Sequence, residues 1–97
     1  MKHTINGRRY EIVYTDDIPD DHAGIWCGLC EPPDKPFKKI YIRNGLPLKT
    51  RLDVLLHESL HAAVWDLSEE TVTATATDLT NLLIKELGME EATTTGE

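Results

Sequence analysis

The amino-acid sequence predicts a small α+β domain in which a three-stranded antiparallel sheet is followed by two helices. Residues 1–49 contain short runs in which apolar and polar residues alternate, separated by Asn-Gly pairs and prolines. From about Thr50 the apolar residues recur with a period near 3.6, which is typical of amphipathic helices. Ninety-seven residues suffice for one modest core, so we expect a single domain over residues 1–88.

The predicted strands lie in the first half of the chain. Asn6-Gly7 separates the runs HTI and RRYEIVY and predicts a two-residue hairpin, because both residues tolerate a positive φ. Residues 15–25 contain a proline and four aspartates and predict a polar loop. The run FKKIYIR, residues 37–43, alternates imperfectly and predicts the third strand.

The predicted helices fill the second half. One apolar stripe predicts a first helix over residues 50–65. A second helix is expected to begin at Asp66 or Ser68 and to end at Gly88, because glycine readily takes the left-handed conformation that closes a helix. Residues 89–97 contain little that can be buried, so we expect a disordered acidic tail.

Charge and composition argue against several functions. The net charge is −7, and residues 50–97 carry two basic and ten acidic side chains. Because an acidic surface repels phosphate groups, we expect no nucleic-acid partner. The sequence contains no apolar run near the ~20 residues of a membrane span. The N-terminus also lacks the apolar stretch of a secretory signal. These features predict a cytoplasmic protein with no membrane partner.

The segment WCGLC, residues 26–30, is one residue different from the WCGPC redox motif of thioredoxins. A redox thiol of that kind lies at a helix N-terminus, whereas EPPDKP follows Cys30 and cannot form a helix. A second alternative is a zinc site made by Cys27, Cys30 and His22, although two cysteines are few for a closed site. The interpretation we favour is structural, with Trp26 packed and both thiols acting as small fillers.

The segment HESLH, residues 57–61, predicts a metal site on the first helix. His57 and His61 are four residues apart, so their imidazoles share one face and can bind the same ion. A helical wheel places Glu58 beside this pair and turned toward open space, where a carboxylate can act as a general base. Zinc is the expected metal.

A catalytic zinc usually has three protein ligands, so a third ligand is required. The candidates are Glu69, Glu70, Asp66, Asp78, His22 and His3. The phase of the second helix turns Glu69 toward the first helix and Glu70 away, which favours Glu69 as the ligand. Glu69 has an alternative role as the last member of a capping box with Asp66.

The run LDVLLHESLHAAVWDLSEE resembles the active-site helix and following glutamate of the zincin-like metallopeptidases, of the kind whose third ligand is Glu. The three-histidine pattern of metzincins is absent, since positions 64 and 67 are Val and Leu. The chain also resembles short phage and bacterial proteins of the SprT-like or ImmA/IrrE-like kind.

This resemblance implies a minimal zincin that hydrolyses a peptide or protein substrate. His57, His61 and Glu69 would hold zinc, and Glu58 would take a proton from the water that zinc activates. The strand at residues 37–43 would form the sheet edge that pairs with the substrate chain.

The sequence departs from these families in several ways. The run EETVTATATDL only partly matches the EAN-x-FA run that follows the third ligand in ImmA-type proteins. SprT-like proteins use a third histidine, and no histidine follows His61 here. The residue that would stabilise the oxyanion is open among Tyr10, Tyr14, Tyr41 and His22. A non-catalytic, zinc-stabilised module for protein interaction is therefore the alternative function.

Overall fold

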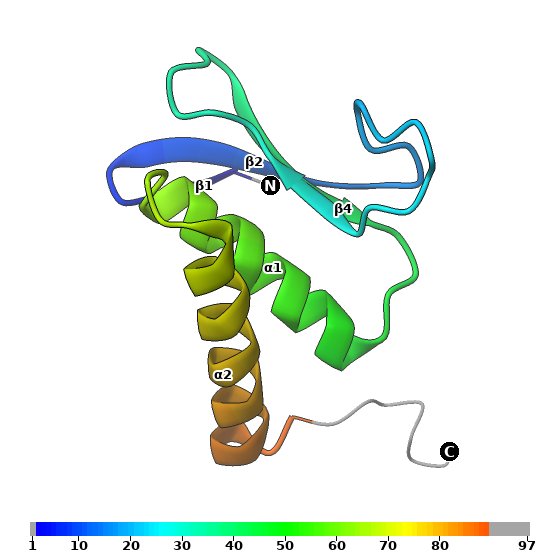
Figure 1. Cartoon of the computed structure of the whole chain (residues 1–97), viewed down its shortest axis with the longest axis vertical. Helices are drawn as coiled ribbons and strands as arrows, with labels where there is room; N and C mark the ends of the chain where they lie inside the picture. The colour runs from blue at the N-terminus through cyan, green and yellow to red at the C-terminus, as the bar shows by residue number, and fades with distance from the viewer. Residues whose placement is uncertain (1, 90–97) are drawn as a thin grey trace.

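The computed structural model of the protein describes residues 2–89 and has an α+β fold, with a four-stranded mixed sheet followed by two helices (Figure 1). The strands are β1 (Lys2–Ile5), β2 (Arg8–Thr15), β3 (Gly28–Cys30) and β4 (Lys38–Arg43), and the helices are α1 (Leu48–Ala63) and α2 (Glu69–Leu87). Of the expected disordered tail, all but residue 89 lies outside the described residues. Neither described helix has the length and apolarity that a membrane crossing requires.

The sheet corrects the prediction of three antiparallel strands. Its strand order is β1-β2-β4-β3, with β2 and β4 parallel and the other two pairs antiparallel. Parallel strands need a long crossover, and residues 16–37 provide it. Within that connection β3 runs back along the outer edge, so β4 enters between β2 and β3. β4, the strand that was expected to form the substrate-binding edge, therefore lies inside the sheet. The edge strands are β1 and β3.

The first hairpin is as predicted. Asn6 and Gly7 have φ values of 48° and 79°, and β1 pairs with β2 on either side of them. The Asn6 side-chain amide donates a 2.6 Å hydrogen bond to the carbonyl of Ala63, in the last turn of α1. The turn thus also satisfies a carbonyl that a helix end leaves without a partner.

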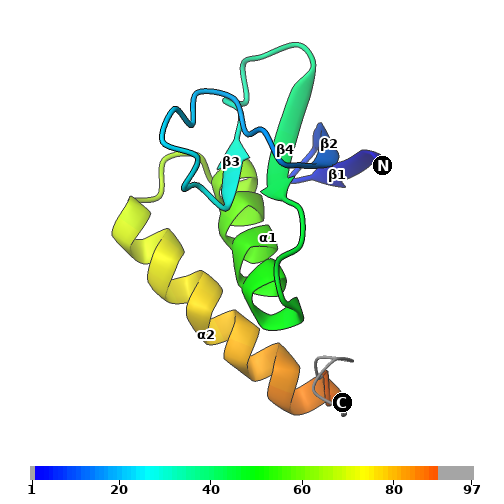
Figure 2. The ribbon, with the colours of Figure 1, turned by 90° about the vertical axis from the view of Figure 1, so that its right-hand side faces the viewer.

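The three layers are the sheet, α1 and α2, in that order (Figure 2). The core between the sheet and α1 contains Tyr10, Cys30, Ile40, Ile42 and Ala62. On the other side of α1, the buried residues of α2 are Val72, Ala76 and Thr80. α1 is the sandwiched helix, and its exposed surface is limited to the strip that the sheet and α2 leave uncovered.

The ends of α2 decide what Glu69 can do. Ser68 is the N-cap, and its hydroxyl accepts a hydrogen bond from the Thr71 N–H at 3.1 Å. The alternative capping box of Asp66 with Glu69 is therefore not formed, and the Glu69 carboxylate is available for other contacts. The predicted C-terminus is confirmed, because Gly88 closes the helix with a φ of 63°.

β3 lies so close to α1 that its first residue has to be glycine. A Cβ at Gly28 would lie 2.7 Å from Val54 Cγ1 and 3.0 Å from Glu58 Cγ and Oε2. Carbon atoms in protein interiors are separated by about 3.5–4.0 Å. The close approach brings the edge strand directly over the Glu58 side chain.

Gly28→Ala is expected to destabilise the protein by about 1–3 kcal/mol, the usual cost of overpacking. The free energy of unfolding in urea measures this. Val54→Ala removes the nearest clashing atom, so the double variant should lose less stability than the sum of the two single variants. Additive losses would contradict the close contact.

Candidate metal centre

Two imidazoles and one carboxylate converge at the C-terminal end of α1. His57 Nε2 lies 2.9 Å from Glu69 Oε2, and His61 Nε2 lies 2.9 Å from Glu69 Oε1. The two rings are 4.9 Å apart between centroids, as the four-residue spacing predicts. All three ligand atoms lie within 4.8 Å of one another. Each oxygen of one carboxylate thus faces a different imidazole.

This donor set fits a zinc ion. Two histidines and a glutamate form a known catalytic combination for zinc, with ligand bonds of about 2.0–2.2 Å. Donor atoms around a tetrahedral ion at such bond lengths are about 3.3 Å apart, and the three ligand atoms here lie within 4.8 Å of one another, so movements of the side chains alone would bring them into place. The imidazoles are sheltered and the Glu69 side chain is 69% exposed, which lets the carboxylate move.

Among the described residues, Glu69 is the third-ligand candidate that joins the two histidines. The short connection after α1 and the Ser68 cap start α2 beside His61, so that the first residue of the helix reaches the site. Glu70 is turned about 100° further around the helix. The remaining candidates, which stay outside this group of ligand atoms, are Asp66, Asp78, His22 and His3.

Glu58 lies in the same cleft but is not turned toward open space as the helical wheel indicated. It is 8% exposed, because β3 covers the side of α1 from which it projects. Burial, with a smaller contribution from the negative charge of Glu69, raises the pKa of Glu58 from 4.5 to about 7. No hydrogen bond from a described residue contributes to that shift.

The cleft that contains these side chains has a volume of about 710 Å³. β3 and the residues before it form one wall, α1 forms the floor, and α2 forms the other wall. Several of its lining residues were missed by sequence reasoning, among them Gly28, Asp53 and Trp65. The spacing of four residues from Asp53 to His57, and from His61 to Trp65, is the signal that could have indicated two of them.

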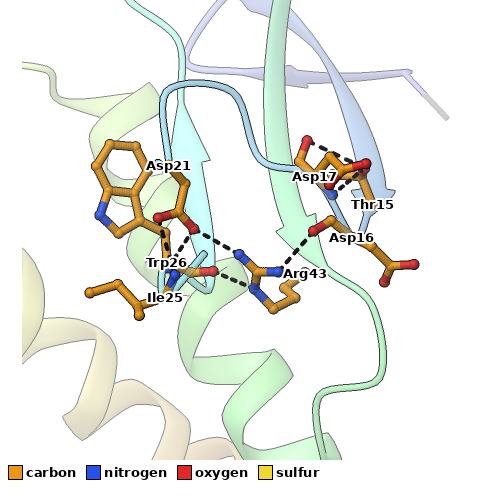
Figure 3. Close-up of polar contacts among 7 residues, drawn as sticks. All are labelled: Thr15, Asp16, Asp17, Asp21, Ile25, Trp26 and Arg43. Atoms are coloured by element: carbon orange, nitrogen blue, oxygen red, sulfur yellow. Dashed lines mark hydrogen bonds and ion pairs between the residues drawn. The ribbon is translucent and has the colours of Figure 1, made fainter. Parts of the chain in front are cut away.

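The loop that forms the rim of the wall is fixed by Arg43, the last residue of β4 (Figure 3). Its guanidinium donates to the carbonyls of Asp16 and Trp26 and forms a 2.7 Å ion pair with Asp21. The Asp21 carboxylate, 2% exposed, also accepts hydrogen bonds from the N–H groups of Ile25 and Trp26. Because Arg43 and Asp21 each make several of these contacts, the loop leads into β3 in a defined position.

The WCGLC segment forms part of a wall of the cleft and does not have the helical geometry of the thioredoxin motif. Residues 28–30 form an edge strand, so neither thiol lies at a helix N-terminus. Cys27 and Cys30 are both free, and no described cluster joins them to His22 as ligands. Cys30 is buried, as expected of a small filler, whereas Trp26 is 40% exposed, which differs from the expectation that its side chain is packed.

None of the four residues proposed for the oxyanion lines the cleft. Tyr10 is buried in the core, and its hydroxyl donates to the Glu31 carbonyl at 3.4 Å. Tyr14 lies beside β1 in a different cavity, and neither Tyr41 nor His22 belongs to the cleft lining. The described lining therefore contains no tyrosine and no third histidine.

Comparisons with protein families, with curated proteins and with solved structures find no match to this chain. Its function has to be inferred from the side chains of the cleft.

The two thiols are expected to differ in reactivity. Burial, with smaller contributions that include the charge of Glu58, raises the pKa of Cys30 to about 12, which leaves almost no thiolate at pH 8. Iodoacetamide at pH 8 should label Cys27 at least about tenfold faster than Cys30, as followed by peptide mass spectrometry. In urea the two rates should become similar. Equal rates in the folded protein would show that Cys30 is not buried between the sheet and α1.

Proposed function

We propose that this protein is a zinc-dependent metallopeptidase of the minimal zincin kind, acting on a peptide or protein substrate. His57, His61 and Glu69 are its zinc ligands, and Glu58 is its general base. One observation carries the proposal: three donor atoms of the types that zinc prefers converge beside a sheltered carboxylate in an open cleft.

Zinc held by these ligands would supply an acidified water molecule and a polarised scissile carbonyl. Glu58 accepts the proton of the attacking water at its carboxylate and delivers it to the leaving amine. Its position suits this role, because it follows His57 directly in α1 and lines the same cleft. Cover by β3 excludes bulk water from most of the carboxylate, which strengthens its interaction with a proton.

The edge strand β3 is the expected partner for the substrate backbone. Hydrogen bonds join Arg43 N–H to the Cys27 carbonyl and Glu31 N–H to the Lys39 carbonyl, so residues 27, 29 and 31 pair with β4. In an antiparallel pair the alternate residues direct their N–H and C=O groups outward. Gly28 and Cys30 thus offer backbone groups to an extended chain beside the cleft.

A second function is favoured by one observation, the lack of a tyrosine or third histidine in the described cleft lining. Without such a group the tetrahedral oxyanion has fewer side-chain donors. A non-catalytic, zinc-stabilised module for protein interaction needs the same ligands but no oxyanion donor.

Glu58→Gln is expected to reduce peptide hydrolysis at least about 100-fold, the usual contribution of a general base, while zinc affinity changes less than about threefold. Cleavage of a peptide library followed by mass spectrometry, and competition with a chromophoric chelator, measure the two effects. Glu70→Gln, the same change outside the cleft, is the matched control. If the wild-type protein hydrolyses nothing while zinc removal unfolds it, the interaction module replaces the peptidase.

Glu69→Ala should weaken zinc binding by at least about tenfold, since it removes one of three ligands, whereas Glu70→Ala should leave it nearly unchanged. Competition titrations on both variants provide the test. Equal losses from the two variants would show that the first turn of α2 is placed differently.

A further inference from the structure

One face of α1 presents a row of four side chains at four-residue spacing to the cleft. Asp53, His57 and His61 belong to the helix, and Trp65 continues the row just after it. Four residues of helix advance by about 6 Å, so Asp53 lies about one turn from the metal centre on the side opposite to Trp65. The cleft thus extends beyond the site of chemistry and ends at a carboxylate.

Three carboxylates line the cleft, and no lysine or arginine does so among its described residues. Glu69 bridges the histidines, and Glu58 is the nine-tenths buried group beneath β3. Asp53 has no place in that arrangement, because its carboxylate is outside the group of converging ligand atoms. Its Oδ2 accepts a long hydrogen bond, 3.4 Å, from the Thr77 hydroxyl across the groove.

The requirements of helix formation do not explain why position 53 is an aspartate. It is the sixth residue of α1, too far along to serve as an N-cap, and aspartate has a low helix propensity in the interior. It is half-buried, and it lines the cleft between α1 and α2. A carboxylate in this position can bind a cationic group that enters the cleft, because hydrogen bonds between oppositely charged groups are the stronger ones.

We propose that Asp53 is a specificity-determining residue, which binds a cationic nitrogen group of the peptide substrate beside the scissile bond. The inference rests on the proposed function and adds a substrate class to it: peptides with a lysine or arginine side chain, or a free terminal amine, near the cleaved bond. An extended chain advances about 3.3–3.6 Å per residue, so the cation belongs about two residues from the scissile bond. Trp65 provides an uncharged surface at the other end.

Peptide binding to the zinc-supplemented Glu58→Gln protein tests this without requiring hydrolysis. The probes are terminally blocked ten-residue peptides in which one lysine is moved along a glycine-alanine background, and matched peptides with acetyl-lysine. We expect the best lysine peptide to bind about tenfold tighter than its acetyl-lysine partner, equivalent to about 1.4 kcal/mol. A third set with a free N-terminus and no lysine distinguishes a terminal amine from a side-chain cation. Equal affinity across all three sets, or no binding of any peptide, would overturn the proposal.

Asp53→Asn, nearly isosteric, should reduce this preference to less than about twofold and leave zinc affinity unchanged. The matched control is Asp78→Asn, which removes the same charge from the exposed part of α2 and should retain the preference. A preference that survives Asp53→Asn would assign the selection to another group and contradict the inference. Failure of the peptidase proposal is seen separately, as absent hydrolysis by the wild-type protein, and leaves the binding measurement intact.

Discussion

The contact between β3 and α1 is the constraint on which the site depends. Because Gly28 has no side chain, the backbone of an edge strand comes within van der Waals distance of Val54 and Glu58. Three consequences follow from this one contact: the carboxylate of Glu58 is covered, the outward N–H and C=O groups of β3 border the cleft, and Cys30 enters the core. Arg43 supports the contact by fixing the preceding loop at the end of β4.

Much of the fold and of the arrangement of the candidate ligands could be predicted because local rules control them. Asn6-Gly7 specifies its turn through positive φ values, Gly88 closes α2, and the spacing of His57 and His61 forces two imidazoles onto one helical face. The position of Glu69 beside the two histidines was predictable from helical phase, since α2 packs against α1 and the phase decides which residues face inward.

The sequence-based predictions that the structure corrects concern places where segments far apart in the sequence meet. The place of β4 in the centre of the sheet depends on β3, a three-residue strand too short to give a periodic signal. The helical wheel considered one apolar face on α1, whereas the helix is covered on several sides, so Glu58 was assigned to solvent and is buried. The exposure of Trp26 follows from a loop whose course is set by Arg43, seventeen residues later.

The electrostatics of the cleft connect stability to function. Raising the pKa of Glu58 from 4.5 to about 7 corresponds to roughly 3 kcal/mol of unfavourable interaction for the charged form, mainly from burial and partly from Glu69. Asp53 adds a third carboxylate to a half of the chain that carries eight more acidic than basic residues. In such a site a bound cation relieves repulsion that the apolar core has to offset in its absence. A divalent metal between His57, His61 and Glu69, and a substrate cation at Asp53, would each relieve part of this repulsion. Because each would also lower the negative potential that attracts the other, their charges alone would make the two binding events mutually weaker.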